Sequence, residues 1–294
     1  MSAPAARAAF KATIAIPVSE PDIALARLAV DALREELEAY PKPGLVSPVD
    51  SGAHDDMDFA LMCRSAESLL QPFARLAAAG RRRLSFDQAL KPLGIEAERH
   101  MLAATGGVNT HRGAIFCMGL VLAALADRMA AGAELMPDKV QAALTAKWGA
   151  ALARHAALGG DDGSHGSVVR RRTGLAGARR EAALGLPSVF QVGLPTYRRA
   201  LADGLNANAA AIETLFVLMA SVDDTTVLFR GGLDAGRLVR HSAAEFLAAG
   251  GCRRPSWSDD AERLHGVFTA SGISAGGCAD LLACTLLVSK CCKG

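Results

Sequence analysis

Residues 106–113 read GGVNTHRG, and residues 114–126 continue directly as the apolar run AIFCMGLVLAALA. This run is too long and too uniform for a half-exposed strand, and it lacks the roughly 18 to 20 apolar residues of a membrane span. The pattern therefore predicts a buried central helix that begins at a glycine-rich polar turn.

The turn before this helix predicts an anion site. A helix N-terminus offers free N–H groups and a partial positive charge, both of which favour phosphate. His111 and Arg112 add further donors, and Asn109 and Thr110 precede them. The alternative is that Asn109 or Thr110 only caps a core helix while Arg112 is solvated.

Composition favours one all-α domain. The 294 residues are 51% hydrophobic and only 5% aromatic, and alanine and leucine are abundant, as in closely packed helices. We expect a single compact helical domain over residues 21–294, with functional loops that converge on a central pocket. Residues 1–20 are expected to form a poorly ordered N-terminal extension.

Charge and cysteine content limit the classes of partner. The net charge of +2, with acids and bases mixed along the chain, gives no basic field for nucleic acid or a membrane surface. The seven cysteines show neither a paired zinc pattern nor a disulfide framework, and the short, broken apolar stretch of the first twenty residues is not expected to act as a secretory signal. We therefore expect a cytoplasmic protein with reduced thiols; the sequence is also compatible with a homodimer.

An acidic turn predicts a cation site in the first part of the chain. An amphipathic helix over 21–40 ends at the sequence PKPG, residues 41–44, and a second helix begins after HDDMD, residues 54–58. A single N-cap explains one of the carboxylates Asp55, Asp56 and Asp58 but not all three. Clustered carboxylates suit Mg²⁺, so we predict metal or substrate binding here.

The second half of the chain repeats the pattern of polar turns joined to apolar helices. Residues 159–178 lack an apolar period and predict a long mobile connection of the kind that often forms a functional lid. Residues 187–195 predict a bend. An apolar helix over 206–222 precedes an acidic turn at 223–232, and two helices are expected at about 233–249 and 257–270. The glycines 276–277 open the last helix, where backbone can approach a ligand closely.

The polar turns combine acidic residues, glycines and cationic side chains, and the sequence has no nucleophilic Ser or Cys motif. This combination suits a polyphosphate substrate or chemistry at the anomeric carbon of a ribose. That carbon reacts through an oxocarbenium-like state, which carboxylates stabilise, with a general base on the incoming hydroxyl. The residues alone leave phosphoryl transfer and glycosyl transfer equally open.

A resemblance to a known family distinguishes between these two reactions. It rests on Glu36 with the sequence PKPGLV, and on blocks of residues 52–59, 107–116, 177–189, 224–232 and 276–282. These blocks occur in the same order in the triphosphoribosyl-dephospho-CoA synthases, which this chain resembles. Three positions depart from the family pattern: Arg180 replaces a glycine, Thr226 replaces an asparagine, and the turn 274–278 reads SAGGC in place of SPGGS.

The resemblance implies that ATP and 3′-dephospho-CoA give 2′-(5″-triphosphoribosyl)-3′-dephospho-CoA and adenine. This product serves a holo-acyl-carrier-protein synthase and the acyl-carrier subunit of malonate decarboxylase or of citrate lyase. The malonate decarboxylase branch is favoured by the alanine-rich and arginine-rich composition and by residues 192–195.

Roles for individual residues follow from the resemblance as expectations. Mg²⁺ is expected on Asp55, Asp56, Asp58 and Asp224. Glu181 and Glu36 are the candidates for the general base. The expected substrate-binding residues are Lys42, His54, Asn109, Thr110, His111, Arg112, Arg179, Arg230, Gly276 and Gly277. Two other functions remain open: a metal-dependent nucleotide hydrolase similar to the ADP-ribosylglycohydrolases, and a nucleotide-binding protein without turnover.

Overall fold

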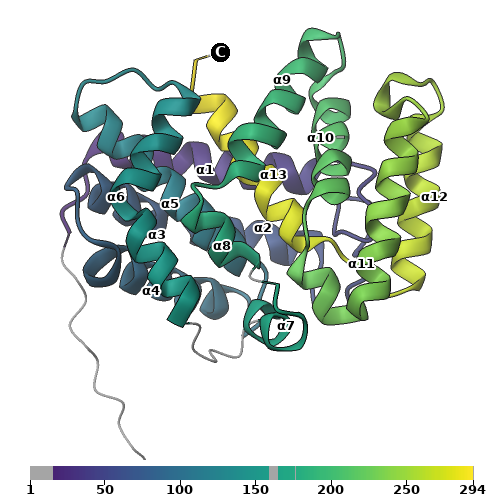
Figure 1. Cartoon of the computed structure of the whole chain (residues 1–294), viewed down its shortest axis with the longest axis horizontal. Coiled ribbons are helices and arrows are strands. Elements are labelled where there is room, and N and C mark those ends of the chain that lie inside the picture. The colour runs from purple at the N-terminus through teal and green to yellow at the C-terminus, as the bar shows by residue number, and fades with distance from the viewer. Residues whose placement is uncertain (1–15, 159–164, 176, 294) are drawn as a thin grey trace, which may run out of the picture.

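The computed structural model describes residues 16–158, 165–175 and 177–293 (Figure 1). Within these ranges all regular structure is helical, as the composition predicted. The α-helices are α1 Glu20–Glu38, α2 Phe59–Ser68, α3 Leu70–Arg81, α4 Lys91–Ala104, α5 Arg112–Ala130, α6 Pro137–Leu158, α7 His165–Thr173, α8 Gly177–Ala183, α9 Leu194–Ala202, α10 Ala207–Ser221, α11 Thr225–Ala248, α12 Trp257–Ala270 and α13 Gly276–Cys291. Two π-helical segments, η1 Phe86–Leu90 and η2 Ser188–Gly193, and a short 3₁₀ segment, η3 Gly251–Arg253, complete the fold.

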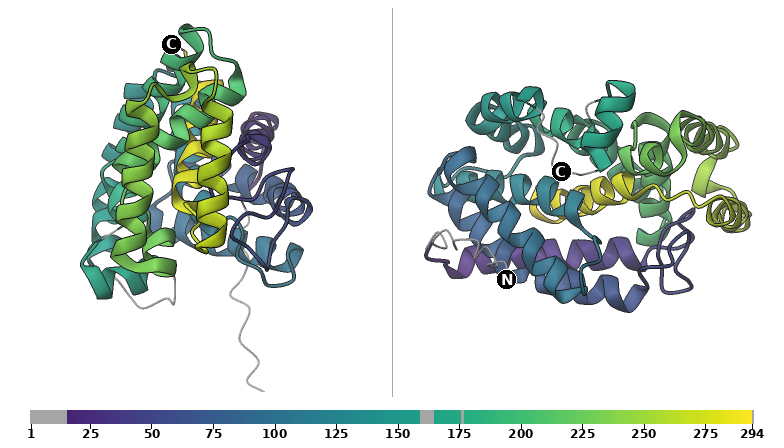
Figure 2. Two further views of the ribbon diagram at one scale, coloured as in Figure 1. Left: turned by 90° about the vertical axis from the view of Figure 1, so that its right-hand side faces the viewer. Right: turned by 90° about the horizontal axis from the view of Figure 1, so that it is seen from below.

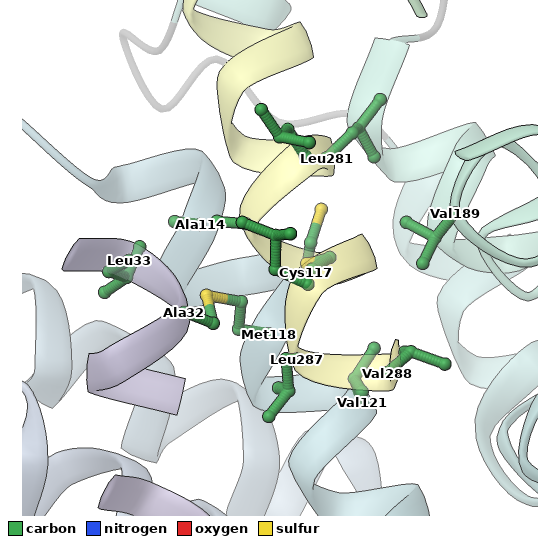
Figure 3. Close-up of a cluster of buried hydrophobic side chains, with 14 of the residues drawn as sticks. Ala32, Leu33, Ala114, Cys117, Met118, Val121, Val189, Leu281, Leu287 and Val288 are labelled. Carbon is green, nitrogen blue, oxygen red and sulfur yellow. The ribbon is translucent and has the colours of Figure 1, made fainter. Parts of the chain in front are cut away.

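The predicted central helix is α5, and it organises the core. It packs against α3, α6 and α13, and nearly all of its residues from Ala114 to Asp127 are buried. Figure 3 shows Cys117, Met118 and Val121 of α5 against Leu287 and Val288 of α13. Burying such apolar side chains gains roughly 1.5–3 kcal/mol each, so this contact is a main source of stability.

The run 114–126 is too short for a membrane span, but the helix that contains it is longer. The whole helix Arg112–Ala130 is long and apolar enough to cross a membrane by length and composition, but 72% of its apolar window is buried inside the protein. Burial against neighbouring helices accounts for its hydropathy.

The last helix joins the two halves of the molecule. α13 contacts α1 and α5 on one side and η2, α9 and α10 on the other. Figure 2 (right) shows α13 between α1 and the helices that follow residue 165. Because α13 starts beside α11 and the N-terminus of α5, its first turn lies where several chain segments meet.

Three expectations for the second half need correction. Residues 165–173 form the helix α7 instead of an irregular connection; residues 159–164 and 176 lie outside the described residues. The predicted bend at 187–195 is η2 leading into α9. Helix α11 starts at Thr225 and is interrupted at Gly232, where φ is +69°, so the predicted turn is helical on both sides of one break. α7 was missed because the three consecutive residues Arg170, Arg171 and Arg172 make the segment strongly polar, which obscures the two buried positions Ser167 and Val169.

Candidate active site

A cavity of about 690 Å³ lies where the polar turns meet, as predicted. Its wall combines residues from the end of α1 and the loop after it, the N-terminal ends of α5, α11 and α13, and α7 and α8. This volume falls within the range of small-molecule sites.

The first acidic side chain in the wall is Glu36, which forms an ion pair with Lys42. Lys42 Nζ lies 2.7 Å from Glu36 Oε1 and also donates to the backbone oxygen of Glu36. Both side chains are almost fully buried. His265 holds the loop that carries Lys42, because its Nδ1 lies 2.8 Å from the Lys42 carbonyl and its Nε2 lies 3.0 Å from Asp50.

Asp224 is the second acidic group, and it links two helices. It caps α11 by accepting the backbone N–H groups of Thr226 and Val227, and it accepts the N–H of Cys278 in the first turn of α13 at 2.8 Å. Burial raises the pKa of Asp224, although these N–H groups oppose the shift. A Cβ added at Gly277 would lie 3.0 Å from the carboxylate, so the glycine allows this close approach.

Asp280 is the third acidic group, and the sequence analysis did not select it. Its carboxylate accepts the backbone N–H of Ala114 at the N-terminus of α5. A Cβ added at Gly113 would lie only 2.0 Å from Asp280 Oδ2. Burial raises the pKa of Asp280 well above its usual range, and the negative charges of Glu36 and Asp224 raise it further.

These three side chains, Glu36, Asp224 and Asp280, form what we name the carboxylate floor. Lys42 lies beside them as a buried cation. The predicted anion site at the N-terminus of α5 therefore already faces a carboxylate of the protein.

More exposed arginines line the same cavity, and we name them the arginine rim: Arg112, Arg179, Arg180 and Arg230. Arg112 forms an ion pair with Glu98 at 3.1 Å, and Arg230 donates to the carbonyl of Ala53. The rim thus offers guanidinium groups in contact with solvent, which suits bidentate binding of phosphate.

His111 lies deep in the wall and is 2% exposed. Its Nδ1 lies 2.7 Å from Ser65 Oγ, which in turn lies 2.6 Å from Thr110 Oγ1. Its Nε2 is buried and has no hydrogen-bond partner among the described residues. Burial, followed by the nearby charge of Lys42, lowers the pKa of His111 to about 4, so the imidazole is neutral at pH 7.

The other predicted substrate-binding residues also lie at the cavity. His54 Nε2 is 2.9 Å from the hydroxyl of Ser274, in the turn that departs from the family pattern. Burial and then the charge of Arg230 lower the pKa of His54. Asn109, Gly276 and Gly277 complete this part of the wall.

The predicted metal ligands are not brought together. Asp56 and Asp224 line the cavity, whereas Asp55 and Asp58 do not. Asp58 is the N-cap of α2 and accepts the N–H of Leu61 at 2.7 Å, which is the alternative role considered for one carboxylate. Within the described ranges, no group of three or more His, Cys, Asp or Glu side chains is arranged to hold a metal ion.

The two candidates for the general base already have partners. Glu36 pairs with Lys42, and Glu181 accepts the backbone N–H of Ser188 at 2.6 Å, which ties α8 to η2. Both side chains line the cavity.

Sequence reasoning missed Asp280 although a signal was present. It is the only charged residue between Gly276 and Ser289 in an otherwise apolar stretch. A lone carboxylate on such a helix is costly to bury, which favours a functional role.

Comparisons with known proteins identify the family of the chain. Residues 23–294 match the family model described as ATP:dephospho-CoA triphosphoribosyl transferase. A probable 2-(5″-triphosphoribosyl)-3′-dephosphocoenzyme-A synthase of Acinetobacter calcoaceticus is 37% identical over 94% of this chain and 93% of its own length. The synthase of Klebsiella pneumoniae is 38% identical over 90% and 94%, respectively.

A third relative, from Azotobacter vinelandii, is called a probable synthase of the same kind and is 40% identical over 96% of this chain and 95% of its own length. No solved structure matches this chain significantly. The chain belongs to the ATP:dephospho-CoA triphosphoribosyl transferase family.

Proposed function

We propose that this transferase joins C1″ of the ribose of ATP to the 2′-hydroxyl of 3′-dephospho-CoA and releases adenine. The observation that carries the proposal is the division of one cavity into a carboxylate floor and an arginine rim. A substrate that carries a triphosphate at one end and develops positive charge at the other matches this division.

The arginine rim would bind the triphosphate. Arg112, Arg179 and Arg230 present planar guanidinium groups that match phosphate oxygens, and Arg180 adds a fourth. Since these side chains lie nearer the solvent than the floor, the triphosphate would occupy the outer part of the cavity and direct the ribose inward.

The carboxylate floor would stabilise the ribosyl cation that develops as adenine leaves. Buried charges act through a low dielectric and therefore influence a developing charge strongly. Glu36 has its charge balanced by Lys42, whereas Asp224 and Asp280 are held by backbone N–H groups.

Magnesium fits this site as a partner of the triphosphate. Burial raises the pKa values of Asp224 and Asp280, so a cation that compensates these buried carboxylates would be bound favourably. Mg²⁺ commonly binds through one or two carboxylates together with substrate phosphates, so a complete protein cage is not needed. Asp224 would hold the ion together with Asp56 at the cavity edge, which leaves Glu36 and Asp280 to face the ribose. When bound, Mg²⁺ neutralises phosphate charge.

Incubation of the pure protein with ATP, Mg²⁺ and 3′-dephospho-CoA tests the proposal. We expect adenine release that requires dephospho-CoA and a product with the mass of the triphosphoribosyl adduct. Release of adenine or ADP-ribose-like products without the acceptor would instead support the hydrolase. Bound ATP without turnover would support the binding protein.

The malonate decarboxylase branch remains our proposal for the pathway. It is supported by the alanine-rich and arginine-rich composition and by residues 192–195. The test is to supply the product, with a holo-acyl-carrier-protein synthase, to the carrier subunits of malonate decarboxylase and of citrate lyase. Preferential modification of the citrate lyase subunit would refute this assignment.

We also place the protein in the cytoplasm. All seven cysteines are free, five of them buried, as expected in a reducing compartment. Fractionation of cells that express the tagged protein would test the location.

A further inference from the structure

A chain of three side chains connects two points on the cavity wall. Thr110 Oγ1, Ser65 Oγ and His111 Nδ1 follow one another at 2.6 and 2.7 Å. Both ends of the chain, Thr110 and His111, line the cavity, while Ser65 is fully buried behind them. This arrangement is separate from the carboxylate floor and the arginine rim.

The hydrogen atoms of this chain can be arranged in two ways. In one, His111 Nδ1–H donates to Ser65, Ser65 donates to Thr110, and His111 Nε2 carries a free lone pair. In the other, every donor and acceptor is reversed, and Nε2 carries the proton. Each arrangement keeps the histidine neutral, in agreement with its lowered pKa of about 4. The chain can therefore move a proton from one end to the other without leaving a buried charge.

Contacts with neighbouring residues hold these three side chains in place. The backbone N–H of His111 contacts Met101 Sδ at 3.1 Å, and Thr105 donates to the carbonyl of Val108 at 2.6 Å. Ser65 lies on α2 and reaches across to residues that are 45 and 46 positions later. The partnerless Nε2 atom is the feature that needs an explanation, because buried polar atoms are normally hydrogen-bonded.

Resting on the proposed glycosyl transfer, we infer that His111, Ser65 and Thr110 form a proton relay from the acceptor hydroxyl to the departing adenine. The 2′-hydroxyl gives its proton to His111 Nε2 as its oxygen bonds to C1″. His111 Nδ1–H passes its proton to Ser65, Ser65 passes its proton to Thr110, and Thr110 protonates a nitrogen of adenine. The C1″–N9 bond breaks, and its electron pair stays with adenine.

The relay balances protons and charge. One proton enters at Nε2 and one leaves at Thr110, so the three side chains end neutral in the reversed arrangement. Exchange with water and rotation of the two hydroxyl groups after product release restore the first arrangement. The relay thus supplies the base and the acid of the reaction together, and it leaves Glu181 and Glu36 to act by charge and position.

The test separates the two ends of the relay. Thr110→Val removes the last donor, while Thr110→Ser keeps a hydroxyl and serves as the matched control. With ATP we expect kcat of Thr110→Val to fall about 100-fold at unchanged KM, and Thr110→Ser to stay within a few-fold of the unaltered protein. A ribose 5-triphosphate that carries 4-nitrophenolate at C1 needs no proton on its leaving group. We expect this substrate to restore part of the turnover of Thr110→Val, with the proton of the acceptor hydroxyl held on His111 until it passes to water.

His111→Gln affects the other end of the relay. We expect it to lower kcat with both substrates, because the acceptor hydroxyl loses its base in each case. Unfolding curves of all three variants check that the fold is retained.

Two results would overturn the relay. One is an unchanged kcat with a raised KM for ATP in Thr110→Val, which would show that Thr110 only binds substrate. The other is a lowered kcat of Thr110→Val that the nitrophenolate substrate does not raise. An unaltered protein that makes no triphosphoribosyl adduct would instead refute the proposed function. Glu181→Gln with normal turnover would support the relay, and a loss of orders of magnitude with normal His111→Gln turnover would assign the base to Glu181.

Discussion

The carboxylate floor and the arginine rim share one cavity but differ in burial, and the difference separates their roles. Glu36 and Asp224 are 4% and 6% exposed, whereas Arg230 and Arg180 are exposed. Charges in contact with water are screened and contribute mainly to binding, while buried charges strongly influence a reacting centre. We therefore expect changes in the floor to act on kcat and changes in the rim to act on KM.

The largest effect is expected on removal of magnesium. Chelation with EDTA should abolish turnover, and added Mg²⁺ should restore it, because the negative charge of the triphosphate would otherwise lie uncompensated beside Asp224. Asp224→Asn should raise the Mg²⁺ concentration that gives half-maximal rate, whereas Asp55→Asn and Asp58→Asn should not. Full activity in EDTA, or equal effects of all three variants, would contradict the placement of the ion on the floor.

Asp280→Asn should lower kcat by about 10³-fold, because it removes a half-buried negative charge opposite the ribosyl cation. The same change relieves the cost of desolvating a carboxylate beside Glu36 and Asp224, so the melting temperature should stay the same or rise. Steady-state kinetics and thermal unfolding of one preparation test both expectations. A less stable variant with normal kcat would identify Asp280 as a structural residue.

Arg230→Ala should raise the KM for ATP by about 10-fold or more and change kcat little, since charge-assisted hydrogen bonds contribute roughly 1.5–3 kcal/mol. Arg237→Ala is the matched control, because Arg237 is on the same helix but does not line the cavity. High salt should weaken ATP binding to the unaltered protein more than to Arg230→Ala. A loss confined to kcat would break the distinction between floor and rim.

The smallest expected effect is the contribution of His111 to the pH dependence of folding stability. The pKa of His111 falls from 6.5 to about 4 on folding, so the unfolded chain binds more protons between these values. Stability should therefore decrease as the pH falls from 7 to 4, with about 3 kcal/mol attributable to this group. His111→Gln should reduce the slope of unfolding free energy against pH over that range. An unchanged slope would indicate that folding does not lower the pKa of His111.

The sequence predicts the fold well where the signals are local. The apolar run 114–126 became α5, and one carboxylate of the acidic turn, Asp58, is the N-cap of α2. The predicted helix over 206–222 is α10, Ala207–Ser221. Hydrophobic period and cap chemistry act within a few residues, so they can be read without the tertiary structure.

The site was harder to predict because its geometry depends on distant contacts. Asp55, Asp56 and Asp58 are neighbours in the sequence, but Asp58 caps α2 and only Asp56 lines the cavity. Asp280 was overlooked because its helix reads as core, and only the packing of α13 against α5 brings it to Ala114. The roles predicted for the individual site residues stay predictions until the variants are measured.

The contact between Gly113 and Asp280 has a consequence for how the two positions can vary. Since a Cβ at residue 113 would lie 2.0 Å from an Asp280 carboxylate oxygen, a side chain at the first position requires this carboxylate to move. In a double-mutant cycle, Gly113→Ala should lower the free energy of unfolding strongly in the unaltered protein. It should lower it only slightly in a protein that already carries Asp280→Gly, so the two substitutions are strongly non-additive. The two positions are therefore sterically coupled, although they stand 167 positions apart.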